Sequence, residues 1–141
     1  MTKKISKKLS ANDIGSTGAH QAGILVPKQK EILDFFPSLN PRQRNPRQTL
    51  VIRELTDRTR WEFNLIYYNN RFFGGTRNEF RLTCMTQYLR SVDAKIGDEL
   101  IFSKDENESI LIQCIRGNAN KPALTSDGVL ILSGGWKIVN T

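Results

Sequence analysis

Apolar and polar residues alternate along most of the chain from residue 48 onward. Between Trp61 and Tyr68 the large apolar side chains fall on every second position, a pattern typical of a half-buried antiparallel strand. Turn-forming residues separate this segment from others of similar composition. The pattern predicts strands at residues 22–26, 50–55, 61–68, 78–85, 109–115, 129–132 and 136–139, and a turn from Val92 that leads into a strand ending at Phe102.

One segment near the N-terminus predicts a helix instead. The apolar side chains between Ile32 and Phe36 would form a buried face, and Pro27 suits a first helical turn, so we expect a helix over residues 28–36. A proline-rich extended loop follows. Its arginines are Arg42, Arg44 and Arg47. Seven or eight short strands with so little helix predict a mainly β, barrel-like fold, and 141 residues suit a single domain.

The first twenty residues are polar and predict two segments outside the strands. We expect residues 2–8 to be a lysine-rich tail that stays flexible until it meets a partner. Residues 9–21 combine three hydroxyl side chains, two amides and two glycines. That composition indicates a shaped loop rather than a linker.

Charge is distributed unevenly along the chain, whose formal net charge is +7. Residues 1–90 contain 16 Lys or Arg against 7 acidic residues (+9), whereas residues 91–141 contain 5 against 7 (−2). Ten of the eleven arginines lie between Arg42 and Arg90, and arginine forms planar, bidentate contacts with phosphate or guanine. We therefore expect one face that meets a polyanion, with a merely basic surface as the alternative.

Composition excludes several other classes. No apolar run is long enough to span a bilayer, and no apolar segment follows the N-terminal lysines, so we expect a cytoplasmic protein without a membrane partner. Cys84 and Cys114 fall in predicted strands, which suits small buried side chains in a reducing compartment. With one histidine and no C-x-x-C pair, we expect no metal site and no cofactor in this chain.

The segment from Tyr67 to Arg81 combines aromatic residues, a glycine pair and side chains suited to reading base edges. In the major groove, Arg pairs with guanine, Asn with adenine, and Glu accepts from cytosine. These types occur together in Arg77, Asn78, Glu79 and Arg81. Gly74 and Gly75 would supply positive φ angles and a close backbone approach to phosphate. A hairpin turn with solvated charges is the alternative.

Two segments carry a longer pattern. The first comprises Lys8-Leu9-Ser10-Ala11-Asn12-Asp13, Gly15, Thr17-Gly18, His20-Gln21 and residues 24–27. The second comprises Tyr67-Tyr68-Asn69, Arg71, Phe73-Gly74, Thr76-Arg77-Asn78-Glu79 and Arg81. Together they resemble the N-terminal effector DNA-binding domain of EcoRII-type restriction endonucleases. The resemblance covers residues 8–83, and the remainder is similar in strand pattern alone.

The resemblance implies a seven-stranded DNA-binding pseudobarrel with one or two short helices, a fold shared with plant auxin-response transcription factors. Two arms, a first arm (residues 8–21) and a second arm (residues 71–81), would grip double-stranded DNA and read its major groove at a CC(A/T)GG-like site. The implied DNA-binding residues are Lys8, Asn12, Asp13, Thr17, His20, Gln21, Arg71, Arg77, Asn78, Glu79 and Arg81. Gly75 and Phe80 stand where a relative of this family is expected to have lysines. The chain would then either compensate for the missing phosphate contacts through Arg42, Arg44 and Arg47 or bind DNA more weakly.

By the same resemblance the parent protein is a type II restriction endonuclease, with a tethered nuclease domain that uses Mg²⁺. The isolated domain would be a monomer. Alternatives are a stand-alone transcriptional regulator of the same fold and a self-contained nuclease. An RNA-binding role is disfavoured because side chains cannot readily enter the deep major groove of A-form RNA.

The chain itself lacks the sequence pattern of a nuclease. The common restriction-nuclease site needs an Asp/Glu-x-Lys element, and the one example here, Asp93-Ala94-Lys95, falls in a predicted turn before Gly97. The single histidine, His20, has no evident carboxylate partner for nucleophilic catalysis. We therefore expect a chain that binds DNA without cutting it.

Overall fold

The computed structural model describes residues 3–15, 23–117, 129–131 and 135–140. Its strands are β1 (Lys3–Lys8), β2 (Ile24–Val26), β3 (Arg47–Glu54), β4 (Arg60–Tyr68), β5 (Glu79–Thr83), β6 (Glu99–Lys104), β7 (Ile110–Ile115), β8 (Val129–Ile131) and β9 (Trp136–Asn140). Its helices are α1 (Lys30–Leu33), the 3-10 helix η1 (Asn70–Phe73) and α2 (Thr86–Ser91). The prediction of a mainly β domain is confirmed.

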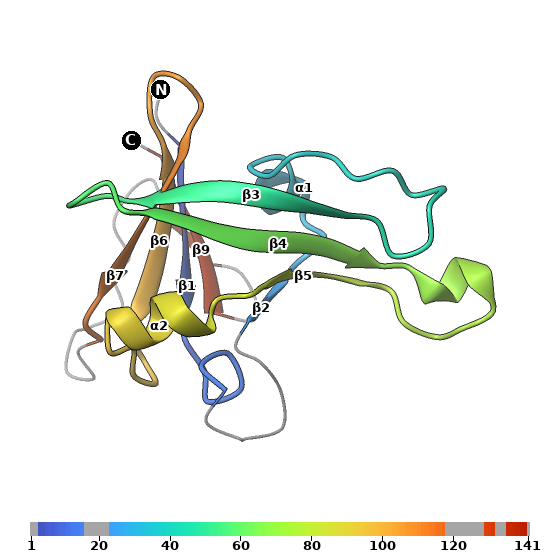
Figure 1. Ribbon diagram of the computed structural model, residues 1–141, viewed down its shortest axis with the longest axis horizontal. Helices are drawn as coiled ribbons and strands as arrows, with labels where there is room; N and C mark the ends of the chain where they lie inside the picture. Colours follow the sequence, from blue (N-terminus) through green and yellow to red (C-terminus); the bar gives the residue numbers. More distant parts are fainter. Residues whose placement is uncertain (1–2, 16–22, 118–128, 132–134, 141) are drawn as a thin grey trace.

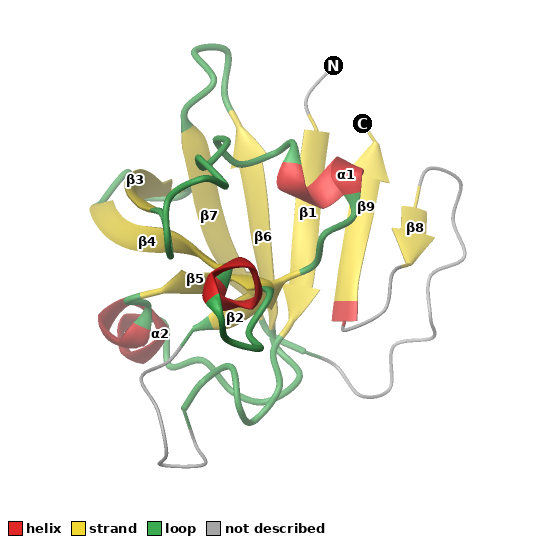
Figure 2. Ribbon diagram, turned by 90° about the vertical axis from the view of Figure 1, so that its right-hand side faces the viewer, coloured by secondary structure: helices red, strands yellow, loops and turns green. Residues whose placement is uncertain are grey.

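All nine strands belong to one sheet with the order β2-β5-β4-β3-β7-β6-β1-β9-β8. Neighbouring strands are antiparallel except for β3 and β7, which run parallel. Figure 1 shows β3 and β4 running along the long axis of the molecule, whereas β1, β6, β7 and β9 run steeply to them. Figure 2 shows these four strands side by side. The sheet is therefore strongly curled around one core.

Side chains from both halves of the curled sheet meet inside it. The fully buried residues include Ile5, Ile52, Phe63, Leu82, Phe102 and Trp136. The Trp136 ring stacks on Phe102, with 6.3 Å between centroids, and its Nε1 donates to the Leu25 carbonyl at 3.0 Å. Because Leu25 is in β2 and Trp136 in β9, this bond links strands that lie far apart in the sheet order.

Every strand predicted from alternation overlaps an observed strand. The helix predicted over residues 28–36 is the short α1, and a turn continues it to Phe36. Its apolar face is as expected, because Ile32, Phe35 and Phe36 are all buried. The alternation pattern did not locate α2, which has only two buried side chains. Among the described residues no helix is long and apolar enough to cross a membrane.

The expectation of a flexible N-terminal tail was wrong. Residues 3–8 form β1, which pairs with β6 on one side and β9 on the other, with Lys3 opposite Asn140. Ile5 is fully buried, and Lys7 is only 6% exposed. Four lysines in six residues hide this strand from a pattern search, although lysine can bury its aliphatic stem while its charge finds a partner.

The two cysteines are free thiols. Burial raises the pKa of the half-buried Cys114 to about 11, so its thiol is protonated at neutral pH. The expectation that Cys84 is buried was wrong, since it is exposed just after β5 ends. Its backbone is left-handed there, with φ of 65°, and its sulfur accepts from Asn64 Nδ2 at 3.5 Å.

Candidate nucleic-acid interface

The two predicted arms leave the sheet at opposite ends of the β2–β5 pair. The second arm enters β5 at Glu79 and its last residues belong to that strand, whereas Gly23, just after the first arm, lies against Leu82 and Thr83. Four strand steps separate Glu79 from Thr83, or about 13 Å. In Figure 1 the described part of the first arm lies below the sheet and the second arm extends to the right. The arms therefore flank β5.

The second arm is a closed loop rather than an extended strand. After β4 the chain forms η1, and the Arg71 amide donates to the Arg77 carbonyl at 2.9 Å across the loop. Gly74 has φ of 90°, as its position predicted. Gly75 is required for a different reason, because a Cβ there would lie 2.8 Å from the Asn70 side chain. Both glycines thus shape the arm itself.

Three of the predicted reading residues form one polar network at the root of the second arm. Arg77 Nε donates to Glu79 Oε1 at 2.6 Å, and Arg81 Nη1 lies 3.7 Å from Glu79 Oε2. The Arg77 guanidinium also lies 3.7 Å from the centre of the Tyr68 ring. Within the described residues, the terminal nitrogens of Arg77 have no hydrogen-bond partner. Arg77 is therefore fixed through Nε, and the edge with its two terminal nitrogens remains available to a ligand.

The fourth reading residue, Asn78, faces Tyr67. Its Oδ1 accepts from the Tyr67 hydroxyl at 2.8 Å, so one of the groups needed to pair with adenine is already engaged. The Tyr67 ring stacks on Phe80 with 4.1 Å between centroids and 3° between planes. Phe80 therefore packs against a neighbouring ring of the sheet.

The tip of the second arm is both basic and aromatic. Arg71 is exposed, and Phe72 and Phe73 are 64% and 42% exposed. Neighbouring exposed apolar side chains form a patch of the kind that marks an interaction site, whereas apolar side chains scattered singly over a surface are ordinary. Both phenylalanines lie outside the hydrophobic core.

Residues of the first arm differ in their exposure to solvent and in their contacts. Lys8 and Asn12 are exposed. Asp13 is 6% exposed, and its carboxylate lies 3.0 Å from Lys7 Nζ and accepts from the Ser10 amide at 2.9 Å. This carboxylate fixes the arm to β1 and is turned away from solvent, so its geometry does not suit a DNA contact. Thr17, His20 and Gln21 lie outside the described residues.

Asn69 holds the candidate site together, a role that the sequence reasoning missed. It is fully buried at the root of the second arm, where its Oδ1 accepts from the Asn45 amide at 2.7 Å. Its Nδ2 donates to the carbonyls of Pro41 and Gln43 at 3.1 and 2.7 Å. We call residues 41–47 the arginine loop. Asn69 holds this loop beside the second arm, and no local pattern distinguishes such a buried asparagine from the polar residues around it.

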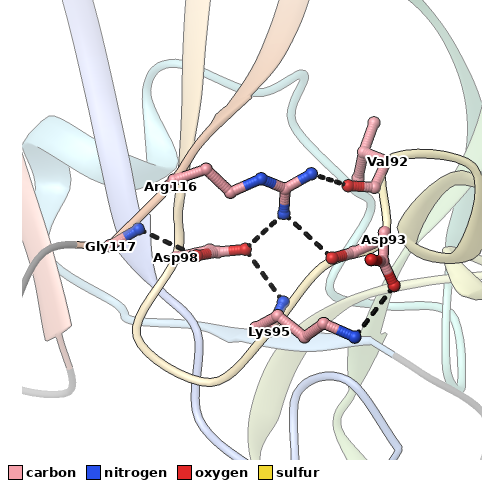
Figure 3. Close-up of polar contacts among 6 residues, drawn as sticks. All are labelled: Val92, Asp93, Lys95, Asp98, Arg116 and Gly117. Carbon is pink, nitrogen blue, oxygen red and sulfur yellow. Dashed lines mark hydrogen bonds and ion pairs between the residues drawn. The ribbon is translucent and has the colours of Figure 1, made fainter.

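A second charged cluster is structural and lies beside the start of the first arm, where the Leu9 amide donates to the Asp98 carbonyl at 2.8 Å. Asp98 is 3% exposed and accepts from the Lys95 amide at 2.9 Å, the Gly117 amide at 2.8 Å and Arg116 Nη1 at 2.7 Å. Arg116 also donates to the carbonyls of Val92 and Asp93, so the cluster ties the loop before β6 to the end of β7 (Figure 3).

Hydrogen bonds outweigh burial in setting the ionisation of Asp98. Burial alone would raise its pKa, but the bonds from Gly117, Lys95 and Arg116 lower the pKa below its ordinary value. The neighbouring Asp93 and Lys95, which form the Asp-x-Lys element, pair with each other at 2.9 Å on an exposed turn. Within the described ranges no three His, Cys, Asp or Glu side chains gather as metal ligands would.

Comparison with known families assigns the fold. The model of the family described as "Restriction endonuclease EcoRII, N-terminal" matches residues 2–108, about three quarters of the chain. The chain belongs to the EcoRII N-terminal domain family. Over 79 residues this EcoRII N-terminal domain is 46% identical to the type II restriction enzyme EcoRII of Escherichia coli, a match covering 55% of the chain and 19% of that enzyme.

Plant proteins are also similar to this EcoRII N-terminal domain. Auxin response factor 5 of Arabidopsis thaliana is 29% identical over 125 residues, which is 89% of the chain and 13% of the plant protein. A solved structure described as "Arabidopsis FUS3-DNA complex" superposes with a TM-score of 0.64 at 17% identity, over 80% of the chain and 96% of that chain. The predicted pseudobarrel fold is thus confirmed, although the described residues form nine strands where seven were expected. The domain spans less than a fifth of the length of these curated relatives.

Proposed function

We propose that this domain binds double-stranded DNA in a sequence-specific way and serves as the recognition domain of a type II restriction endonuclease. Its family supports this proposal, as does its similarity in fold to FUS3, whose structure is that of a complex with DNA. The observation that carries most of the proposal is the Arg77–Glu79–Arg81 network, which presents a held guanidinium beside an exposed arm tip.

The geometry of Arg77 suits guanine. A bidentate contact to guanine O6 and N7 needs the two terminal nitrogens of an arginine or one of them with Nε. Glu79 occupies Nε, and Tyr68 supports the face of the guanidinium, so the terminal nitrogens are already oriented. Holding them in advance reduces the side-chain entropy that binding would otherwise cost. Arg77 is our candidate for a direct base reader.

The spacing of the arms suits the major groove. Their roots are about 13 Å apart along β5, close to the groove width of about 12 Å. In this arrangement Arg81 would face the groove between the arms. Lys8 and Arg71 would contact phosphates from the two sides, with the remaining first-arm residues Asn12, Thr17, His20 and Gln21 nearby.

Membership of the family supports proposals for the recognition site and for the activity of the parent protein. We propose a CC(A/T)GG-like recognition sequence, a nuclease domain elsewhere in the parent protein that uses Mg²⁺, and a monomeric, cytoplasmic DNA-binding unit without a cofactor of its own. Of these features the recognition sequence is the most easily altered, because one changed base contact shifts discrimination by about 1–3 kcal/mol.

Selection from randomised duplexes at a stated salt concentration tests the proposal. Arg77→Ala should lower discrimination between the selected and a scrambled duplex by about 1–3 kcal/mol, because it removes a base contact. Lys8→Ala should weaken both duplexes alike, because a phosphate contact carries no sequence information. Binding is measured by titration over a range of salt concentrations.

Arg60→Ala is the matched control for Arg77→Ala. Arg60 also pairs with a glutamate two residues on, Glu62 at 3.1 Å, but it begins β4 at the end of that strand remote from the second arm. Arg60→Ala should leave discrimination between the selected and the scrambled duplex unchanged. An equal loss on both duplexes for Arg77→Ala would remove its base-reading role, and a wild-type chain that holds all duplexes equally would refute sequence-specific binding.

A transcriptional regulator is the second candidate. The similarity to auxin response factors supports it, because it spans 89% of the chain, more than the match to the EcoRII enzyme. The two candidates share the domain and differ in what it is joined to. Incubating the whole natural protein with plasmid carrying the selected site and Mg²⁺ separates them, since the restriction enzyme cleaves and the regulator does not.

A further inference from the structure

The arginine loop is built as part of the second arm. Besides the three bonds to Asn69, the Pro46 carbonyl accepts from the Tyr67 amide at 2.9 Å, and Arg44 Nε donates to Asn70 Oδ1 at 3.4 Å. Asn45 adopts a left-handed backbone, with φ of 49°, while its amide bonds to Asn69. The loop is thus held in one conformation by the root of the second arm, and Figure 1 shows the two projecting together.

The charges on this loop are unpaired. Arg42, Arg44 and Arg47 are all exposed, and in the part of the chain that the structure describes none of them forms an ion pair with a carboxylate. Arg77 of the second arm differs in this respect, because it is paired with Glu79. Three unpaired guanidinium groups on a fixed loop favour an anionic partner, and arginine suits phosphate.

The place of the arginine loop in the sheet determines which DNA phosphates it could reach. β3, β4 and β5 are neighbours in the sheet, and Arg47 in β3 is level with Ile66 in β4 and through it with Arg81 in β5. Arg47 therefore lies two strand spacings, about 10 Å, from Arg81. About 10 Å along duplex DNA corresponds to roughly three base pairs at 3.4 Å each. The loop lies on the β3 side of the second arm, whereas the first arm adjoins β2.

We propose that the arginine loop is a third DNA-contacting element, which binds phosphates about three base pairs beyond the bases read by the second arm, and that Asn69 is the residue that positions it. This inference rests on the proposed function, because it needs the second arm to lie on DNA. It adds contacts to flanking DNA that carry affinity without sequence discrimination.

Charge removal on the loop is the first test. For Arg42→Gln/Arg44→Gln, the slope of log affinity against log salt concentration should become shallower by up to about 1.8, since each phosphate contact contributes about 0.9. The loss should be equal on the selected and scrambled duplexes. Arg53→Gln/Arg58→Gln, at the other end of β3, removes the same charge and should leave the slope near that of the wild type.

Duplex length gives an independent test. Trimming the selected duplex from five flanking base pairs on each side to none should weaken wild-type binding and flatten its salt dependence. Arg42→Gln/Arg44→Gln should lose much less on the same trimming, because its flanking contacts are already gone. Equal sensitivity of both proteins to trimming would overturn the inference.

Asn69→Ala tests the positioning role. It changes no charge, yet it should flatten the salt dependence as the double loop variant does, and it should add nothing in the background of that variant. Near-UV circular dichroism verifies that it is folded. A folded Asn69→Ala with the wild-type slope would show that Asn69 is merely structural, and if the variant does not fold, charge removal and trimming decide.

The two proposals fail in different ways. If the wild-type chain does not discriminate between duplexes, the proposed function fails. If it discriminates normally while the loop variants keep the wild-type salt slope and the wild-type response to trimming, the third element alone is refuted.

Discussion

At the scale of single residues, one glutamate organises the candidate reading surface. Glu79 contacts Arg77 through one carboxylate oxygen and lies near Arg81 through the other. The side chains of this network are only partly exposed, which limits solvent screening of the attraction between them. The negative charge of Glu79 holds both arginines and also weakens their attraction to a polyanion. It therefore favours discrimination between sequences over overall binding affinity.

Asp98 should control stability in a pH-dependent way. Asp98→Asn should lower the free energy of unfolding by about 2–3 kcal/mol at pH 7, because it replaces a buried charged acceptor of three hydrogen bonds. The folded pKa of Asp98 is lowered, so its stabilisation is complete above the unfolded pKa of about 3.9 and is lost as pH falls through the folded value.

Urea unfolding at pH 7 and at pH 3 measures this effect. The gap between the wild type and Asp98→Asn should be constant near neutral pH and should shrink below about pH 4. Asp93→Asn is the control, because Asp93 is an exposed residue of the same loop and an exposed pair contributes about 0–1 kcal/mol. A gap that widens in acid would contradict the assignment.

Residue types predicted chemistry better than they predicted exposure. Arg77, Glu79 and Arg81 were chosen because each suits a base edge, and the structure brings them together in one network, while their contact with bases stays a prediction. Asp13 was chosen on the same grounds, but its partner is Lys7, in a segment whose lysines concealed a strand. Burial depends on what the rest of the chain places around a side chain, and no local pattern supplies that information.

At the scale of elements, the first arm depends on a buried ion pair at its root. Lys7 and Asp13 side chains are each 8% exposed, with 3.0 Å between Nζ and Oδ2. Asp13→Asn should therefore lower the free energy of unfolding by about 3–5 kcal/mol, because it leaves the Lys7 charge buried without its partner. Thermal or urea unfolding monitored by circular dichroism provides the measurement.

The neighbouring Asn12→Ala is the control for Asp13→Asn. Asn12 is exposed in the same turn, so its replacement should change stability by no more than about 0.5 kcal/mol. Similar losses for both variants would indicate that the turn, and not the ion pair, fixes the arm.

Strands were easier to predict than the remaining elements, for a physical reason. Alternation over four or more residues has few explanations other than a half-buried strand, whereas short helices contribute too few apolar side chains to show a period. η1 is four residues long and buries none of them, and α2 buries two. The positions of η1 and α2 depend on the loops around them, and those loops are fixed by contacts between residues that lie far apart in the sequence.

At the scale of the whole molecule, the sheet depends on its N-terminal strand. β1 lies between β6 and β9 and supplies the fully buried Ile5. Removing residues 1–8 should therefore prevent cooperative folding, rather than only weaken DNA binding as the loss of a basic tail would. The test compares the shortened chain with Lys4→Gln/Lys8→Gln, which removes charge but keeps the strand.

A sharp thermal transition for the shortened chain, at a temperature near that of the wild type, would contradict this prediction. The charge variant should keep its transition and bind DNA somewhat more weakly at low salt, because only its electrostatic attraction is reduced.

The pairing of Lys3 with Asn140 has a consequence for how the domain can be joined to others. The two ends of the described chain emerge side by side, one strand length, about 17 Å, from the root of the first arm. In the proposed DNA complex, a linker at either end would thus leave from a single attachment point set back from the duplex. Whatever it carries could swing alongside the DNA without displacing the arms.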